Sequence, residues 1–239
     1  MLEDAYPTIK SFLEFMIHFG TNTTDGLVHP TGFDWLGDWQ APHGCSDGND
    51  PDLYNNAYII YALRRAVEII EAIGDEDIAP YADSLKFELA AENMSQALHK
   101  IFYNSTSHCY SPSQGVPRQG HQIMALISGA VPPSLVSTVL DYLFYELSDP
   151  EGTAAGHIDT GLKTTYFLGK MLSGGMEEIV GAAADRADLI YAATLNPSWP
   201  SYSALIAAGL TTWPETWAIG NVAGGVSKMH GTLNGFGLT

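Results

Sequence analysis

A single carboxylate in an aromatic setting is the clearest chemical signal in this sequence. Glu215 stands in the stretch 211–217, TTWPETW, with Trp213 before it and Trp217 after it. Indole faces are flat and apolar, and they pack well against the C–H face of a sugar ring. A carboxylate beside them is partly desolvated, which suits it to proton transfer. The stretch indicates either a sugar-processing site or a surface turn whose two tryptophans belong to the core.

The composition limits the kind of partner this protein binds. The chain has 239 residues, of which 46% are hydrophobic and 15% charged, so it can bury a substantial core. Lys and Arg total 10 against 27 Asp and Glu, which gives a formal charge of −17. Such a surface repels nucleic acid and anionic membranes, and no apolar run approaches the ~20 residues that span a bilayer. The expected partner is a neutral ligand, with neither nucleic acid nor membrane.

Apolar residues recur at three- and four-residue steps along most of the chain. Hardly any segment alternates with period two, and no Asn-Gly or Asp-Gly turn joins β-branched runs. The pattern predicts about nine helices. They are expected over 2–19, a segment that includes 60–70 and ends at Gly74, 78–102, 121–127, 132–147, 160–172, 176–193, 200–208 and from about 224. These helices predict an all-α toroid of helical hairpins, with long loops on one face holding the site.

The long stretch 21–51 contains FDWLGDW at 33–39, which is too aromatic for a linker, so we expect an ordered loop. Cys45 and Cys109 form one disulfide or stay free, and the sequence leaves both possibilities open. A secreted eukaryotic protein is favoured by Asn-X-Ser/Thr sequons at Asn22, Asn93 and Asn104.

Short motifs follow one another in a recognisable order. They are GDWxxP at 37–42, RQGHQ at 118–122, GHIDTG at 156–161, PSW at 197–199, TTxxExW at 211–217 and SxxH at 227–230. In order and spacing this set resembles the catalytic (α/α)6 domain of the α-L-rhamnosidases, glycoside hydrolase family 78, over nearly the whole chain. The resemblance implies that residues 1–239 form a single six-hairpin glycosidase domain, a toroid incomplete at both ends.

The resemblance also implies an activity, the inverting hydrolysis of terminal α-L-rhamnose with Glu215 as general base. Inversion needs a second carboxyl group as general acid, roughly 6.5–9.5 Å away. In the family that acid precedes the Gly-Asp-Trp loop, and residues 1–21 offer no counterpart, so we expect the chain to be a fragment. Pro214 stands where the family usually has Trp, and it constrains the backbone next to Glu215.

The candidate substrate-binding residues are Asp38, Trp39, His157, Trp217 and His230. Each has a structural alternative. Trp39 is a sugar platform or an anchor of its own loop, and Asp38 binds sugar hydroxyls or organises an Asx turn. His157 faces the cleft or, with Asp159, belongs to the start of a helix. His230 contacts the sugar or lies in the core.

Trp199, which follows Pro197 and Ser198, is more typical of a core residue than of a ligand. Metal and cofactor chemistry has little support, because no zinc, calcium or phosphate-loop motif occurs. We therefore expect no cofactor. A serine hydrolase is disfavoured, because no Gly-x-Ser-x-Gly motif occurs. Two other functions stay open: another (α/α)6 sugar hydrolase, such as an unsaturated glucuronyl hydrolase, and a non-catalytic sugar-binding remnant that lacks the general acid.

Overall fold

The computed structural model describes residues 1–21, 23–29, 37–42, 50–112, 115–149, 154, 156–212, 214 and 216–217. Within these residues the protein is mostly helical. They are α1 (Leu2–Thr21), α2 (Asp50–Ile73), α3 (Tyr81–Phe102), α4 (Gln119–Ser128), α5 (Val136–Ser148), α6 (Leu162–Leu172), α7 (Glu177–Val180), α8 (Ala187–Leu195) and α9 (Tyr202–Ala207). A two-stranded antiparallel hairpin, β1 (Tyr103–Asn104) with β2 (Cys109–Tyr110), follows α3.

Most predicted helices are confirmed, and the bounds differ where a glycine or a proline ends or delays a helix. The helix predicted over 176–193 is wrong, because Gly181 (φ +78°) ends α7 and a 3-10 turn separates it from α8. Pro133 begins a 3-10 turn, so α5 starts only at Val136. The segment between α3 and α4, where the apolar pattern predicts no helix, contains strand β2. The helix expected from about 224 lies outside the described residues.

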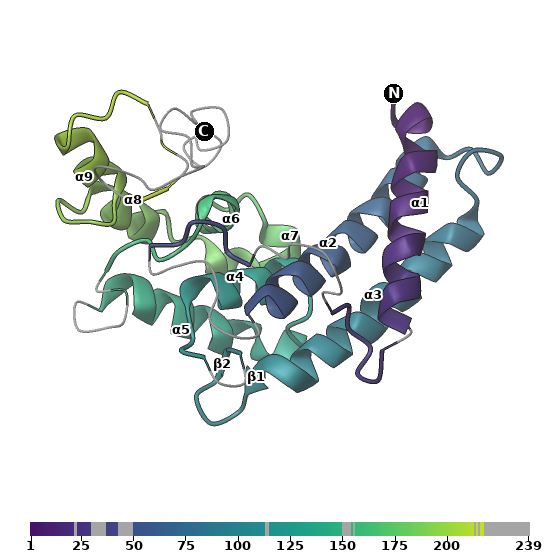
Figure 1. Cartoon of the computed structure of the whole chain (residues 1–239), viewed down its shortest axis with the longest axis horizontal. Helices are drawn as coiled ribbons and strands as arrows, with labels where there is room; N and C mark the ends of the chain where they lie inside the picture. Colours follow the sequence, from purple (N-terminus) through teal and green to yellow (C-terminus); the bar gives the residue numbers. More distant parts are fainter. Residues whose placement is uncertain are drawn as a thin grey trace.

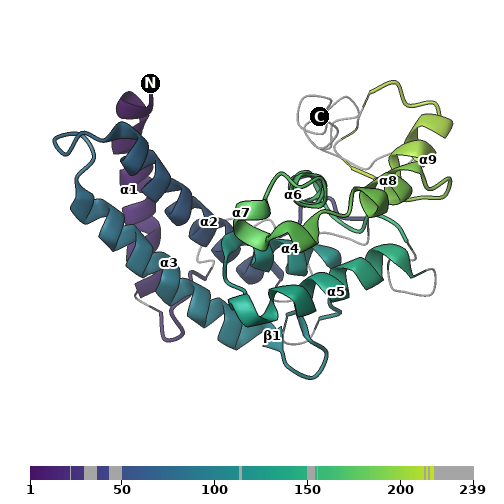
Figure 2. The ribbon, with the colours of Figure 1, turned by 180° about the vertical axis from the view of Figure 1, so that it is seen from behind.

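Helix α4 is the centre of the structure, and all of its residues are buried. It packs against α2, α5, α6 and α7, and α2 in turn packs against α1 and α3 (Figures 1 and 2). A helix with no exposed face must satisfy its polar side chains internally. Residues from every layer meet in one core cluster, among them Leu63, Phe87, Ile123, Leu143 and Leu168.

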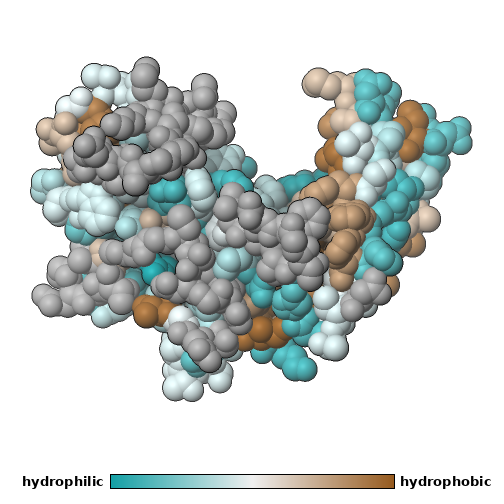
Figure 3. All heavy atoms as spheres, viewed as in Figure 1, coloured by the Kyte–Doolittle hydropathy of each residue, from teal (hydrophilic) through white to brown (hydrophobic). Residues whose placement is uncertain are grey.

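The helices of the described residues form an open arc, with α1–α3 in one arm and α8–α9 in the other (Figure 1). Asp83 of α3 ties α1 to this arm, because Tyr6 Oη and Lys10 Nζ each donate a hydrogen bond of 2.7 Å to its Oδ2. Phe12 and Phe15 of α1 remain 52% and 44% exposed. Figure 3 shows hydrophobic surface on this arm where it borders the hollow of the arc.

The cysteines differ in what the structure says of them. Cys109 is buried and free, whereas Cys45 lies outside the described residues. Burial raises the pKa of the Cys109 thiol, with hydrogen bonds from Ser107 and Tyr142 acting in the opposite direction. The thiol is therefore held in its neutral, packed form rather than as a reactive thiolate.

His29 joins the segment before the Gly-Asp-Trp loop to the start of α2. Its Nδ1 lies 3.0 Å from Asp52 Oδ2, and its Nε2 lies 2.9 Å from Asp25 Oδ2. Ionised carboxylates only accept hydrogen bonds, so both ring nitrogens donate when the bridge is complete. Burial lowers the pKa of His29, but the two carboxylates outweigh burial and the net pKa is raised. The bridge thus favours the imidazolium.

This bridge predicts a pH dependence of stability. Because the pKa of His29 is raised on folding, its contribution is complete below the unfolded pKa of about 6.5 and is lost as the pH rises through the folded value. We expect the free energy of unfolding, measured with urea from about pH 6 to 9, to fall more steeply in the wild type than in His29→Gln. Equal slopes in the two proteins would contradict the bridge.

Candidate active site

Asp38, in the Gly-Asp-Trp motif, lies where the first turns of three helices meet. Its side chain is buried, and Thr164 Oγ1 of α6 donates a 2.5 Å hydrogen bond to its Oδ1. Tyr54 Oη of α2 donates a longer one of 3.4 Å to Oδ2. Segment 37–42 therefore runs beside the starts of α4 and α6, where the dark blue trace lies in Figure 1. Helix N-termini favour negative charge, so the carboxylate suits this position.

Two glycines make the approach of Asp38 possible. A Cβ on Gly120, in the first turn of α4, would lie 2.0 Å from Tyr54 Oη and 2.8 Å from Asp38 Oδ2. A Cβ on Gly161, just before α6, would lie 2.2 Å from the Trp39 carbonyl oxygen. Neither space admits a side chain. The glycines of the second and third motifs are thus fitted to the residues of the first.

Gln119 connects α4 to the GHIDTG motif through its side-chain amide. Its Nε2 donates to the His157 carbonyl oxygen at 2.7 Å, and its Oε1 accepts from the Asp159 N–H at 3.0 Å. The amide imitates a peptide group and satisfies one donor and one acceptor of a buried backbone. Gln119 is fully buried, so this function is structural.

Gln122 repeats this arrangement one turn later in α4, on a different segment. Its Oε1 accepts from the Tyr110 N–H at 2.7 Å, and its Nε2 donates to the Tyr110 carbonyl oxygen at 2.8 Å. The two glutamines of the RQGHQ motif therefore hold two separate parts of the chain. Between them, His121 Nδ1 accepts the Arg118 N–H at 3.1 Å and closes the start of the helix.

His157 and Asp159 occupy different environments. His157 Nδ1 lies 3.0 Å from the Ala154 carbonyl oxygen, and its Nε2 lies 2.8 Å from Ser198 Oγ. Because a carbonyl only accepts, Nδ1 carries a proton. Asp159 is buried, and its Oδ1 lies 3.8 Å from Arg118 Nη1. The GHIDTG segment thus brings an imidazole and an ion pair to the end where α4 begins.

The two described tryptophans of the last motifs are linked in series. Trp217 Nε1 donates to the Thr160 carbonyl oxygen at 2.7 Å, and its ring packs on Tyr202 with centroids 5.1 Å apart. Trp199 Nε1 donates to the Trp217 carbonyl oxygen at 2.6 Å. Asn196 Nδ2 reaches the Gly156 carbonyl oxygen at 3.4 Å. The PSW turn and the residues after Glu215 therefore belong to the same cluster.

Of the predicted site residues, the structure brings together Asp38, Trp39, His157 and Trp217. Glu215 and His230 lie outside the described residues, although the neighbours of Glu215, Pro214 and Thr216, are both buried. Sequence reasoning missed the linking function of Gln119, Arg118 and Ser198. All three residues stand inside the motifs, which was the available sign of their function. For Gln119 there is also a general reason, because a buried side-chain amide next to the start of a helix typically forms hydrogen bonds with the backbone.

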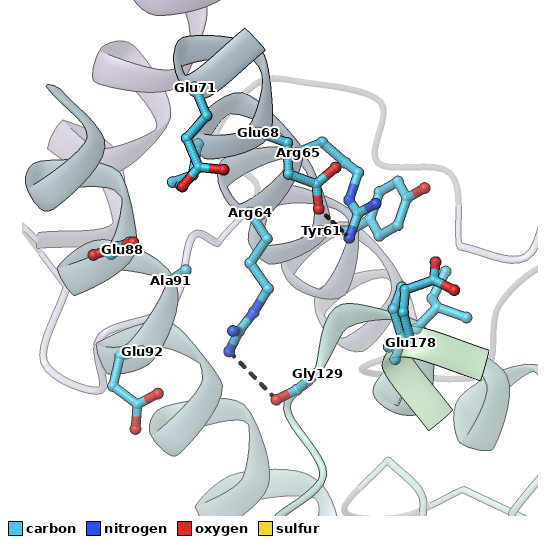
Figure 4. Close-up of a pocket in the computed structure, with 13 residues that line it drawn as sticks. Tyr61, Arg64, Arg65, Glu68, Glu71, Glu88, Ala91, Glu92, Gly129 and Glu178 are labelled. Carbon is cyan, nitrogen blue, oxygen red and sulfur yellow. Dashed lines mark hydrogen bonds and ion pairs between the residues drawn. The ribbon is translucent and has the colours of Figure 1, made fainter. Parts of the chain in front are cut away.

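A groove of about 570 Å³ lies elsewhere, between α2, α3 and α7 (Figure 4). Arg64 extends into it and donates to the Gly129 carbonyl oxygen at 3.4 Å. Carboxylates border it, from Glu68, Glu71, Glu88, Glu92 and Glu178. Gly129 follows the last residue of α4, whereas Asp38 lies at its first turn. The groove is therefore at the opposite end of α4 from the motif cluster.

The described part of the chain gives no sign of two other kinds of site. No cluster of three or more His, Cys, Asp or Glu side chains among these residues has the arrangement of a metal site. None of the described helices is long and apolar enough to cross a membrane.

The side-chain amides of Gln119 and Gln122 bond different segments, so a substitution of each serves as the control for the other. Gln119→Met and Gln122→Met each leave a buried N–H and C=O unsatisfied, so each should cost about 1–3 kcal/mol of unfolding free energy. In hydrogen exchange, Gln119→Met should expose the Asp159 amide while Tyr110 stays protected, and Gln122→Met should do the reverse. Unchanged protection of the Asp159 amide in Gln119→Met would contradict the link.

Comparison with known proteins places the chain in a family. The profile described as the bacterial alpha-L-rhamnosidase 6 hairpin glycosidase domain matches residues 1–237. An alpha-L-rhamnosidase of Formosa agariphila is 25% identical over 222 residues, which are 90% of this chain and 21% of that protein. The chain thus spans about a fifth of the curated relatives it matches.

Solved structures agree on the fold. The alpha-L-rhamnosidase from Dictyoglumus thermophilum superposes with a TM-score of 0.75 at 22% identity, covering 99% of this chain and 24% of its own. That of Streptomyces avermitilis, solved in complex with L-rhamnose, gives 0.69 at 21% identity, covering 99% and 20%. The predicted six-hairpin glycosidase fold is confirmed, as part of a larger protein in these neighbours. The chain belongs to the bacterial α-L-rhamnosidase six-hairpin glycosidase domain family.

Proposed function

We propose that this protein hydrolyses terminal α-L-rhamnosides with inversion, and that Glu215 is the general base. The observation that carries the proposal is the convergence of separate motif segments, 37–42, 118–122, 156–161, 196–201 and 216–217, at the end where α4 and α6 begin. Support comes from the family of the chain and from the S. avermitilis neighbour, which binds L-rhamnose.

In this mechanism Glu215 takes a proton from a water molecule, and the hydroxide attacks the anomeric carbon from the face opposite the leaving group. A second carboxylic acid protonates the departing oxygen. Each proton transfer contributes on the order of 10²–10⁴ to the rate. The buried neighbours Pro214 and Thr216 limit the freedom of the chain on either side of Glu215.

The other motif residues take two kinds of role. Trp39, His157 and His230 are proposed to contact the sugar. Asp38 and Trp217 are buried and hydrogen-bonded to Thr164 and Thr160, so we assign them to holding the site in shape. This choice favours the structural alternative for Asp38 and Trp217 over direct sugar binding.

One observation favours a second candidate function, sugar binding without catalysis. The general acid has no evident source in α1: Glu14 Oε1 pairs with Lys86 Nζ at 2.7 Å, and Glu3 and Asp4 are exposed at the far end of that helix. If no other carboxylate reaches the leaving group, this chain by itself binds rhamnosides and does not cleave them.

Removal of the proposed base separates these functions. Hydrolysis of a chromogenic α-L-rhamnoside is measured with the chain and with any longer polypeptide that its gene encodes. Glu215→Gln should lower kcat by about 10²–10⁴ and leave the thermal midpoint unchanged, because the amide keeps the shape but cannot accept the proton. Glu178→Gln, at the groove of Figure 4, is the matched control and should retain full activity.

Other outcomes have clear meanings. Full activity of Glu215→Gln would contradict its assignment as base. Rhamnose binding without hydrolysis by any version of the wild-type protein would favour the sugar-binding function. Retention of configuration in the first product, observed by NMR, would exclude inversion.

A further inference from the structure

Trp199 is the most exposed tryptophan in the part of the chain that the structure describes. It is 40% exposed, while Trp217 is 3% exposed and Trp39 is half-buried. The core position expected for Trp199 from sequence is therefore wrong. Trp199 thus keeps a large apolar ring open to solvent within the motif cluster, where Trp217 is covered.

The exposed indole is held in one orientation. Its Nε1 donates to the Trp217 carbonyl oxygen at 2.6 Å, so the polar edge faces the protein. The turn that carries it is closed by Asn196, whose Oδ1 accepts from the Ser198 N–H at 3.0 Å and whose carbonyl oxygen accepts from Ser201 Oγ at 2.5 Å. Pro200 is buried. The ring has little freedom left to lose when a ligand binds.

The position of the indole relates it to the proposed chemistry. The carbonyl that anchors it belongs to Trp217, two residues after Glu215 in the sequence, and two residues of chain span about 7 Å at most. The preceding residue, Ser198, bonds His157 at 2.8 Å. An exposed, fixed apolar face thus adjoins both the base segment and the GHIDTG motif.

We propose that Trp199 is a stacking platform for the sugar of the substrate, and that the role of sugar-facing tryptophan in the last motifs belongs to Trp199 rather than Trp217. The inference rests on the proposed function. The ligand class is a neutral pyranose with an apolar face, and a 6-deoxy sugar such as L-rhamnose adds a methyl group to that face. The formal charge of −17 disfavours acidic sugars at the same surface.

The anchor and the platform can be tested separately by two substitutions. Trp199→Ala removes both the ring and the N–H, whereas Trp199→Phe keeps a smaller aromatic face and removes the donor to Trp217. Tyr191→Ala is the matched control, because Tyr191 is 68% exposed on α8 and lies outside the motif cluster. Circular dichroism and the thermal midpoint identify any variant that fails to fold.

Binding of L-rhamnose is measured by titration calorimetry, and rhamnoside hydrolysis by steady-state kinetics. Trp199→Ala should weaken binding and raise KM about tenfold with little change in kcat, because stacking acts alike on substrate and transition state. Trp199→Phe should recover most of the affinity, and Tyr191→Ala should match the wild type.

The contrary outcomes separate this inference from the proposed function. If the wild type binds rhamnose and Trp199→Ala binds it equally, the platform is refuted while the rhamnosidase proposal stands. If Trp199→Phe is as weak as Trp199→Ala, the N–H anchor and not the ring face is what matters, which also refutes stacking. If the wild type neither binds nor hydrolyses rhamnosides, the proposed function fails and the platform with it.

Discussion

The arrangement of the site depends on one carboxylate placed at the starts of helices. Asp38 accepts a short hydrogen bond from Thr164 of α6, lies beside Gly120 of α4 and faces Tyr54 of α2. A buried carboxylate is costly unless charge-assisted hydrogen bonds or helix dipoles compensate it. Here the same groups that compensate Asp38 also fix where three helices begin. The positions of the loops that contain the proposed site residues therefore depend on the contacts of Asp38.

The rest of the cluster is held together largely by side chains that form hydrogen bonds with backbone N–H and C=O groups, in place of other backbone groups. Gln119 bonds the segment from His157 to Asp159, Trp217 bonds the Thr160 carbonyl, and Trp199 bonds the Trp217 carbonyl. Loops without regular structure must find partners for their N–H and C=O groups, and buried amides and indoles provide them. This accounts for the Gln, Trp and Gly residues of the motifs.

Much of the fold followed from the sequence, because apolar periodicity over α2, α3 and α5 reports directly on which face is buried. The break at Gly181 and the 3-10 turn at Pro133 were less predictable, since local punctuation competes with a continuing apolar pattern. The order of the motifs indicated which segments form the site. It did not indicate that Trp199 is exposed and Trp217 buried, because both stand in similar apolar sequence surroundings and only tertiary contacts decide which ring is covered.

We propose that the sugar site lies at the end of the molecule where α4 and α6 begin, and not in the groove at the other end of α4. The most direct measurement is a crystal structure of this protein soaked with L-rhamnose. We expect electron density for one pyranose ring over the exposed face of Trp199, near His157. Density for the sugar beside Arg64 in the groove between α2 and α3, with none at Trp199, would contradict it.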